Sequence, residues 1–273
     1  MSDTNDKDKN DAHERAKAQF ARTAQGYVTS ASHAHGEELA LLLELAAPVA
    51  GRRVLDVATG GGHVALAFAR AGALVTALDL TPAMLEAARA FLASRGVAAH
   101  FVEGAAEALP FEDASFEVVA CRIAAHHFRD PARFVREAAR VLVPGGSFLL
   151  ADNVAPLNAE LAAAMNAVER RRDPSHVEAY SAPRWVAFCA EAGLEPTALE
   201  RFWRVKPYAE WMARAGASAA AITGLEGFVL GLDAAARAYL RVETRSGRLV
   251  SLAHEVMLLA ARRADLAPRV QTS

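Results

Sequence analysis

The chain has 273 residues, of which 53% are hydrophobic and 23% are charged, and its formal net charge is −2. This composition supports a sizeable core and gives no bulk positive field for a nucleic-acid backbone, so we expect no nucleic-acid partner. The longest apolar stretch, residues 39–50, is too short to span a bilayer, and the polar segment 1–11 has no apolar core of the signal-peptide kind. We therefore expect a cytoplasmic protein.

Strand-like and helix-like segments alternate along the chain, which predicts a parallel sheet with crossover helices. The predicted strands are residues 53–57, 74–79, 99–103, 117–121, 147–152, 198–205 and 255–260. The predicted helices are residues 12–25, 37–45, 63–71, 82–94, 131–141, 159–171 and 183–192.

The domain organisation that we expect has five parts. They are a disordered tail (1–11), N-terminal cap helices (12–50), a ligand-binding core (51–155), a segment that completes the sheet (156–262) and a second tail (263–273). The helical stretch 207–239 is predicted to be an insertion before the last strand. Two roles are open for it, a cover over the substrate or a packed surface subdomain.

The most informative stretch is residues 54–62, Val-Leu-Asp-Val-Ala-Thr-Gly-Gly-Gly, which joins a strand-like run to a glycine turn and a helix. Glycine reaches positive φ at little cost and lets a ligand approach the backbone, while the following helix offers unpaired N–H groups. Asp79 lies 19 residues after Gly60, at the end of the second predicted strand, where a carboxylate can accept both hydroxyls of a ribose. The sequence therefore predicts a nucleotide-type ligand.

The turn alone does not name that ligand. Gly60, Gly62 and Ala65 also satisfy the Gly-x-Gly-x-x-Gly/Ala pattern of dinucleotide-binding proteins, so a nicotinamide cofactor stays open at this point. Asp56 fits a buried strand only if it lies at the carboxyl end and faces the ligand cleft.

Further motifs follow at residues 107–111 (Glu-Ala-Leu-Pro-Phe), 116–121 (Phe-Glu-Val-Val-Ala-Cys) and 140–146 (Arg-Val-Leu-Val-Pro-Gly-Gly). With them the chain resembles the class I S-adenosylmethionine-dependent methyltransferases, in particular the small-molecule group of ubiquinone/menaquinone-type (methyltransferase type 11-like) enzymes. The resemblance covers residues 16–155 and extends more weakly to residue 262. It implies an α/β fold, a Rossmann-like doubly wound sheet of about seven strands, mostly parallel with an antiparallel last strand. N-terminal helices and a helical insertion before the last strand complete the expected fold.

The resemblance also implies that S-adenosyl-L-methionine is the cofactor, with its methionine and ribose portions along the glycine turn. The cofactor-binding residues that we predict are Asp56, Ala58, Gly60, Gly61, Gly62, Asp79, Leu80, Ala105, Ala106, Arg122 and Tyr27.

Several of these positions leave alternatives open. Ala58 stands where the family usually has its first glycine. Ala105 replaces an aspartate that often binds the adenine amino group, so backbone groups near Ala105 and Ala106, or another side chain, must serve instead. Tyr27 either closes over the cofactor or packs against a helix. Arg122 either meets an anionic acceptor or pairs with a nearby carboxylate, and we favour the pairing.

The catalytic residues that we predict are His126 and Asp152. His126 follows the fourth strand, and ligands of an open α/β sheet lie beyond the carboxyl ends of its strands. Histidine suits removal of a proton from a hydroxyl acceptor near neutral pH. Asp152 ends the fifth strand, and adjacent parallel strands end on the same side of a sheet, so the two residues can form a dyad. A purely structural role for His126 stays open, and His127 is expected to be structural.

Three functions follow from these motifs. The first is methyl transfer to a small-molecule acceptor, by O- or C-methylation of a hydroxylated or quinol-type compound. The second is a nicotinamide-dependent oxidoreductase, and the third is a methyltransferase-like binding protein without turnover, suggested by Ala58 and Ala105. His33 and His35 could suggest a metal, but they are two imidazoles without a third ligand, so we expect no metal. The acceptor and the oligomeric state are not specified by the sequence.

Overall fold

The computed structural model describes residues 14, 17–20 and 36–265. Tyr27, His33, His35 and most of the predicted helix 12–25 lie outside the described residues. Residues 17–20 are helical, and the described helix nearest to them in the chain is α3 (Glu37–Ala46).

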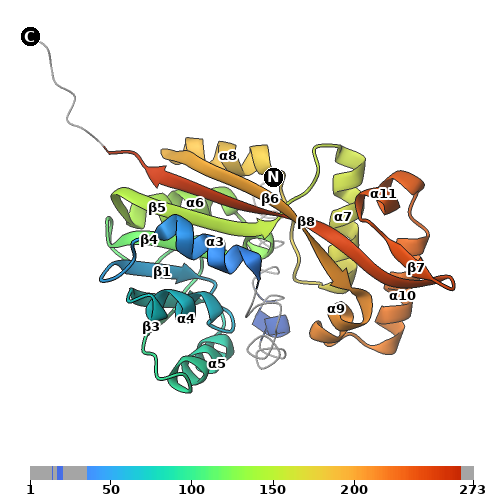
Figure 1. Cartoon of the computed structure of the whole chain (residues 1–273), viewed down its shortest axis with the longest axis horizontal. Helices are drawn as coiled ribbons and strands as arrows, with labels where there is room; N and C mark the ends of the chain where they lie inside the picture. Colours follow the sequence, from blue (N-terminus) through green and yellow to red (C-terminus); the bar gives the residue numbers. More distant parts are fainter. Residues whose placement is uncertain (1–13, 15–16, 21–35, 266–273) are drawn as a thin grey trace, which may run out of the picture.

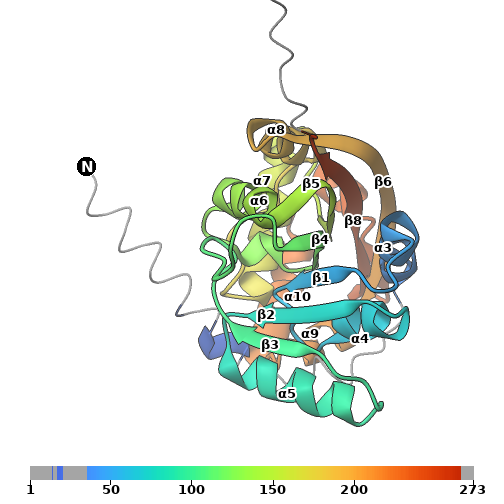
Figure 2. The ribbon, with the colours of Figure 1, turned by 90° about the vertical axis from the view of Figure 1, so that its left-hand side faces the viewer.

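One eight-stranded sheet has the order β3-β2-β1-β4-β5-β8-β6, with β7 paired to β8 (Figures 1 and 2). The strands are β1 (Arg53–Val57), β2 (Leu74–Asp79), β3 (His100–Glu103), β4 (Phe116–Arg122), β5 (Leu142–Asn153), β6 (Leu194–Pro207), β7 (Glu243–Arg245) and β8 (Arg248–Arg263). Strands β1 to β5 pair in parallel, whereas β8 is antiparallel to both β5 and β6. The predicted Rossmann-like sheet, mostly parallel with an antiparallel last strand, is confirmed.

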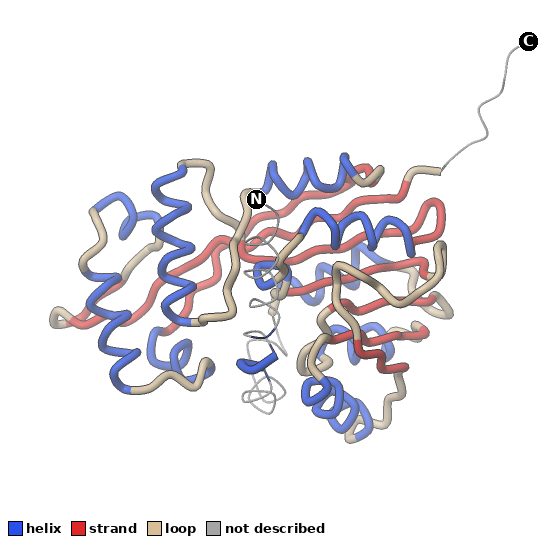
Figure 3. Tube along the Cα trace, turned by 180° about the vertical axis from the view of Figure 1, so that it is seen from behind, coloured by secondary structure: helices blue, strands red, loops and turns tan. Residues whose placement is uncertain are grey.

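Helices cover both faces of this sheet (Figure 3). The further helices are α4 (His63–Arg70), α5 (Pro82–Ala93), the short 3-10 helix η1 (Ala125–His127), α6 (Pro131–Val141), α7 (Ala159–Arg172), α8 (Ala182–Glu191), α9 (Tyr208–Arg214), α10 (Ala219–Leu230) and α11 (Ala234–Tyr239). Alternate side chains of a strand face opposite sides, so Leu55 packs with the core beneath α6 and α8 while Val54 packs with the core beneath α3, α4 and α5. None of the described helices is long and apolar enough to cross a membrane.

A third apolar core lies outside the main sheet, between α7, α9, α10, α11 and the first half of β8. Its largest side chains include Trp211, which is 2% exposed. Figure 1 shows these helices grouped at one end of the molecule, with β6 and β8 running into the group from the sheet. The insertion 207–239 is thus helical as predicted, but β6 and β8 are much longer than the predicted strands 198–205 and 255–260, and β7 was missed.

Candidate functional site

Two adjoining cavities lie beyond the carboxyl ends of the parallel strands. The first, which we call the glycine-turn cavity, is lined by residues from the ends of β1 to β4. Nine predicted cofactor contacts line it: Asp56, Ala58, Gly60, Gly61, Asp79, Leu80, Ala105, Ala106 and Arg122. Sequence reasoning missed Thr59, His63, Met84, Glu107, Ile123 and His127 among its lining residues.

The turn between β1 and α4 has left-handed backbone conformations at several positions. Ala58 has a φ of 56° and Gly60 a φ of 53°. An alanine in this region costs roughly 1–2 kcal/mol relative to glycine, which explains the family's usual glycine at the position of Ala58. A Cβ atom built on Gly60 would meet no heavy atom within 4 Å, so the space beside this residue is open.

Gly62 differs from the other predicted contacts. It is the N-cap residue of α4 with a φ of 83°, and an added Cβ atom would lie 2.8 Å from Cδ1 of Leu92 and 3.1 Å from Cβ of Ala88. The structure therefore places Gly62 against α5 and outside the lining of the glycine-turn cavity. Its small size serves the packing of α4 on α5.

Asp79 and Asp56 hold the turn in place. The Oδ2 atom of Asp79 accepts the backbone N–H of Gly60 at 2.9 Å, and its Oδ1 atom accepts that of Thr81 at 2.9 Å. The Oδ2 atom of Asp56 accepts the hydroxyl of Thr59 at 2.6 Å and the backbone N–H of Ala65, in the first turn of α4, at 3.1 Å.

Both carboxyl groups have perturbed pKa values. Burial raises the pKa of Asp56 to about 7, against the opposing effect of the Thr59 hydroxyl and the Arg122 charge. Burial also raises the pKa of Asp79, although the N–H of Gly60 favours its ionised form. Because hydrogen bonds to the charged form lower the pKa of a carboxyl group, a ligand hydroxyl that donates to either residue would favour ionisation.

Arg122 pairs with a carboxylate, as the sequence interpretation favoured. Its Nη1 atom lies 2.9 Å from Oε1 of Glu38, on α3, and Arg204, on β6, pairs with the same oxygen. Glu38 is fully buried. Sequence reasoning missed Glu38 because no local pattern reveals that the first turn of α3 brings this side chain to Arg122 at the end of β4.

The second cavity, which we call the polar cavity, has a volume of about 390 Å³. This volume lies within the range of small-molecule sites in proteins. It is lined by η1, α7, α9 and β6, including His126. Ile123 and His127 line both cavities, so the two spaces meet at the end of β4.

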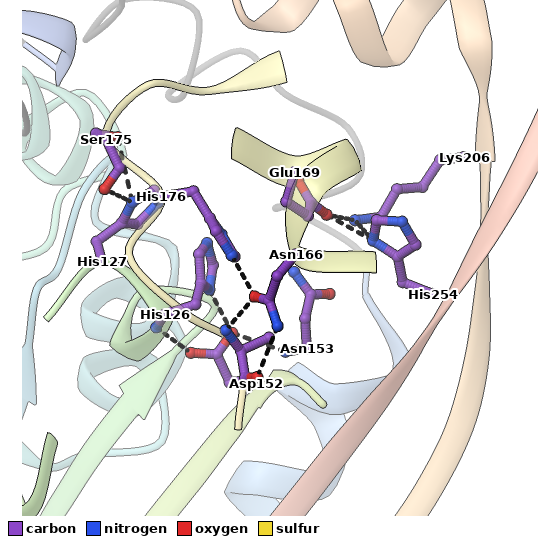
Figure 4. Close-up of polar contacts among 11 residues, drawn as sticks. His126, His127, Asp152, Asn153, Asn166, Glu169, Ser175, His176, Lys206 and His254 are labelled. Carbon is purple, nitrogen blue, oxygen red and sulfur yellow. Dashed lines mark hydrogen bonds and ion pairs between the residues drawn. The ribbon is translucent and has the colours of Figure 1, made fainter. Parts of the chain in front are cut away.

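His126 and Asp152 form the predicted dyad (Figure 4). The Nδ1 atom of His126 lies 2.6 Å from Oδ1 of Asp152, and the backbone N–H of His126 donates to Oδ2 at 3.0 Å. Asp152 is completely buried and His126 is 7% exposed. With Nδ1 as the donor to Asp152, Nε2 carries the lone pair, and no described residue hydrogen-bonds to it. This arrangement can accept a proton at Nε2.

The environment of His126 favours its charged form. Burial acts to lower its pKa, but the charge of Asp152 and the hydrogen bond to it outweigh burial and leave the pKa raised. Burial lowers the pKa of His127 to about 4 and that of His176 to about 2, and the neighbouring His126 adds to both effects. His127 contacts the carbonyl oxygen of Ser175 through Nδ1 at 3.1 Å, which fits a structural role. His126 is the histidine of the group that can exchange a proton near neutral pH.

A second buried polar cluster was not foreseen. Lys206, on β6, Glu169, on α7, and His254, on β8, meet beside the polar cavity (Figure 4). Asn166 and Glu169 lie three residues apart on α7, on the same helix face as the buried Met165 and Val168. A polar pair on an apolar helix face is the sequence signal that could have indicated this cluster. In the described part of the chain no three histidine, cysteine, aspartate or glutamate side chains are grouped so as to hold a metal ion.

Comparisons with known proteins agree with this geometry. The family described as a methyltransferase domain matches residues 55–150. The uncharacterized methyltransferase YcgJ of Bacillus subtilis is 39% identical over 201 residues, which are 73% of this chain and 79% of YcgJ. A crystal structure of a Bacillus halodurans protein superposes with a TM-score of 0.81 at 40% identity, and the match covers 84% of this chain and 100% of that one.

Similarity to relatives with a named acceptor is confined to a smaller region. The ubiquinone biosynthesis O-methyltransferase of Ralstonia nicotianae is 44% identical over 105 residues, which are 38% of this chain and 44% of that enzyme. The chain thus spans less than half the length of that relative.

The doubly wound fold, the glycine turn and these matches define the class of protein. The chain belongs to the class I S-adenosylmethionine-dependent methyltransferases. It is an enzyme, and S-adenosyl-L-methionine is its cofactor.

Proposed function

We propose that this methyltransferase binds S-adenosylmethionine in the glycine-turn cavity and methylates an oxygen of a small-molecule acceptor in the polar cavity. The observation that carries the proposal is the junction of the two cavities at Ile123 and His127, with the His126–Asp152 dyad beside the junction. A methyl donor and an acceptor in these two spaces would meet next to a group that can take a proton.

The glycine-turn cavity fits the cofactor on two counts. The position beside Gly60 is open, so a ligand can approach the backbone of the turn without meeting a side chain. Asp79 also lines this cavity, and its carboxylate is fixed by the backbone N–H groups of Gly60 and Thr81, with the Thr81 hydroxyl and the Leu80 N–H as further donors. We propose that Asp79 accepts from ribose hydroxyls and that backbone groups of Ala105 and Ala106 meet the adenine.

When bound, S-adenosylmethionine supplies a methyl carbon made electrophilic by its sulfonium. The residues of the chain position the acceptor and remove its proton. The walls of the polar cavity hold the acceptor so that its oxygen lies near His126, and Nε2 of His126 takes the hydroxyl proton. Asp152 fixes the ring orientation through two contacts and stabilises the imidazolium that forms.

The experiment has two stages. Isothermal titration with S-adenosylmethionine, S-adenosylhomocysteine and NAD identifies the cofactor, and we expect binding of the first two alone. Turnover assays on a panel of phenols, hydroxy acids and quinols then test transfer. Cofactor binding without turnover across the panel would favour the alternative of a binding protein. The cytoplasmic location expected from the sequence stays a prediction.

A further inference from the structure

Two cations of the polar cavity lie against the same indole ring. The Nζ atom of Lys206 is 5.2 Å from the ring centroid of Trp211, and the Cζ atom of Arg172 is 4.9 Å from it. All three residues line the polar cavity, and none of them lines the glycine-turn cavity. The two like charges repel each other, and the charge of Arg172 adds to the lowering of the pKa of Lys206.

Only one of the two cations has a carboxylate partner among the described residues. The Nζ atom of Lys206 lies 3.0 Å from Oε1 of Glu169. Arg172 donates through Nε to the carbonyl oxygen of Trp211 at 3.3 Å, and among the described residues no carboxylate lies within ion-pair distance of its guanidinium. Arg172, Lys206 and Glu169 together therefore carry one positive charge.

His254 does not change this balance. Its Nδ1 atom lies 2.5 Å from Oε1 of Glu169, and burial together with the Lys206 charge lowers its pKa to about 4, so it is neutral. Burial lowers the pKa of Lys206 to about 8, with Glu169 opposing and Arg172 adding to the effect. Lys206 is thus mostly protonated at neutral pH, in surroundings that do not fully compensate its charge.

The other carboxylates near the cavity do not supply the missing charge. Glu38 is fully buried and already shared by Arg122 and Arg204. Asp173 accepts the N–H and the hydroxyl of Ser175, and its charge acts on His126 and His127; it is not among the main charges that shift the pKa of Lys206. Glu210 is exposed on α9, which also contributes Arg214 to the lining. In two ion pairs of the cavity the cation is the more exposed partner. The side chain of Lys206 is 9% exposed and that of Glu169 is 4% exposed. The side chain of Arg204 is 20% exposed and that of Glu38 is 0% exposed. The cavity therefore presents cations to a ligand.

We propose that Arg172 and Lys206 bind a carboxylate group of the methyl acceptor, and that the acceptor is therefore a hydroxylated carboxylic acid. The inference rests on the proposed function and names its substrate class. A single negative charge matches the single positive charge of Arg172, Lys206 and Glu169. A neutral quinol would leave that charge uncompensated when it displaced water from the cavity.

The test compares acids with their amides. Binding of paired compounds, such as 3,4-dihydroxybenzoate and 3,4-dihydroxybenzamide together with aliphatic hydroxy acids and their amides, is measured by titration calorimetry in saturating S-adenosylhomocysteine. We expect at least one acid to bind about tenfold or more tightly than its amide, because hydrogen bonds to a charged group are worth roughly 1.5–3 kcal/mol.

Matched variants locate the preference. Arg172→Met and Lys206→Met should each reduce it, while Arg201→Met should keep it, because Arg201 is on β6 but is 53% exposed and pairs with Glu255. If Lys206→Met does not fold, Lys206→Arg provides the second variant, and it should retain the preference for acids.

The proposal is overturned if amides bind as tightly as acids, if no acid in the panel binds at millimolar concentration, or if folded Arg172→Met keeps the full preference. Titration of S-adenosylmethionine alone separates the two claims. If the parent protein does not bind S-adenosylmethionine, the result counts against the proposed function. If it binds the cofactor but does not prefer acids over amides, the result counts only against the carboxylate site.

Discussion

The carboxylate of Asp152 contacts His126 at two points, accepting from the ring through Oδ1 and from the backbone N–H through Oδ2. The register of the sheet makes this possible, because Arg122 at the end of β4 pairs with Ala151 on β5. The carbonyl oxygen of His126 also accepts the N–H groups of Val177 and Glu178, at 3.0 and 3.1 Å. The ring is therefore oriented by the fold, before an acceptor arrives.

Replacement of His126 by alanine tests its role as the base. General-base assistance is typically worth about 10² to 10⁴ in rate, so turnover of a hydroxyl acceptor should fall by that order while cofactor affinity stays nearly intact. The exposed His100→Ala provides a matched control with a parental rate. Single-turnover methylation is the measurement. An undiminished rate in folded His126→Ala would assign this histidine to structure.

The pH dependence of the methylation rate should report the ionisation of His126 in the dyad. His126 must be neutral to accept a proton, so the rate should rise with pH through its raised pKa. Asp152→Asn removes the charge that raises this pKa, so the rising limb should move to lower pH and the maximal rate should fall. A rising limb at the same pH in Asp152→Asn and in the parent would show that Asp152 does not raise the pKa of His126.

The same pair should affect stability with a defined sign. The folded-state pKa of His126 is raised above its unfolded value of about 6.5, so the stabilisation is fully present below that value and is lost as pH rises through the folded pKa. Urea unfolding of Asp152→Asn and of the parent should therefore differ more below pH 6.5 than well above the raised pKa. An equal difference at both ends would exclude a charge effect.

The sequence predicted the parts of the site that depend on local patterns and on strand order. Strands β1 and β2 begin and end where their apolar patterns do, and the dyad followed from the rule that parallel strands end on one side of a sheet. The contacts of Glu38 with Arg204 and of Glu169 with Lys206 could not be predicted in this way. They join residues 166 and 37 positions apart, across elements whose mutual packing leaves no periodic signal. β6 and β8 were predicted too short because Glu195 and Pro196 interrupt the apolar pattern at the start of β6, and Ser251 and His254 interrupt it in the first half of β8.

Replacement of Asp79 by alanine tests the cofactor site. The variant loses up to two hydrogen bonds from ligand hydroxyls to a charged acceptor, each worth roughly 1.5–3 kcal/mol, so affinity for S-adenosylmethionine should fall at least about tenfold. It also leaves the N–H of Gly60 without its acceptor, so thermal melting must show that the variant is folded. Unchanged affinity in a folded variant would remove Asp79 from the site.

Two glycines of the turn should respond differently to substitution. Gly60→Val places a side chain in open space beside the turn, so it should abolish cofactor binding at a strain cost of roughly 1–2 kcal/mol. Gly62→Ala instead meets Leu92 and Ala88, so it should lower the free energy of unfolding by about 1–3 kcal/mol from overpacking. Chemical denaturation measures the stability of each variant, and the cofactor-induced shift in melting temperature measures its cofactor binding. A Gly60→Val protein that still gains stability from the cofactor would show that the turn does not hold it.

Glu38→Gln tests the buried charges that link α3 to both cavities. The substitution leaves the guanidinium groups of Arg122 and Arg204 without their shared counter-charge, and breaking a buried ion pair from one side typically costs about 3–5 kcal/mol. Glu117→Gln is the matched control, because its partner Arg53 is 49% exposed and a surface pair is worth only about 0–1 kcal/mol. Urea denaturation should therefore separate the two variants by several kcal/mol. The additional substitution Arg204→Met should restore part of the loss in Glu38→Gln, since it removes one of the two guanidinium groups that Glu38 contacts. A purely additive double variant would mean that Glu38 and Arg204 are not coupled.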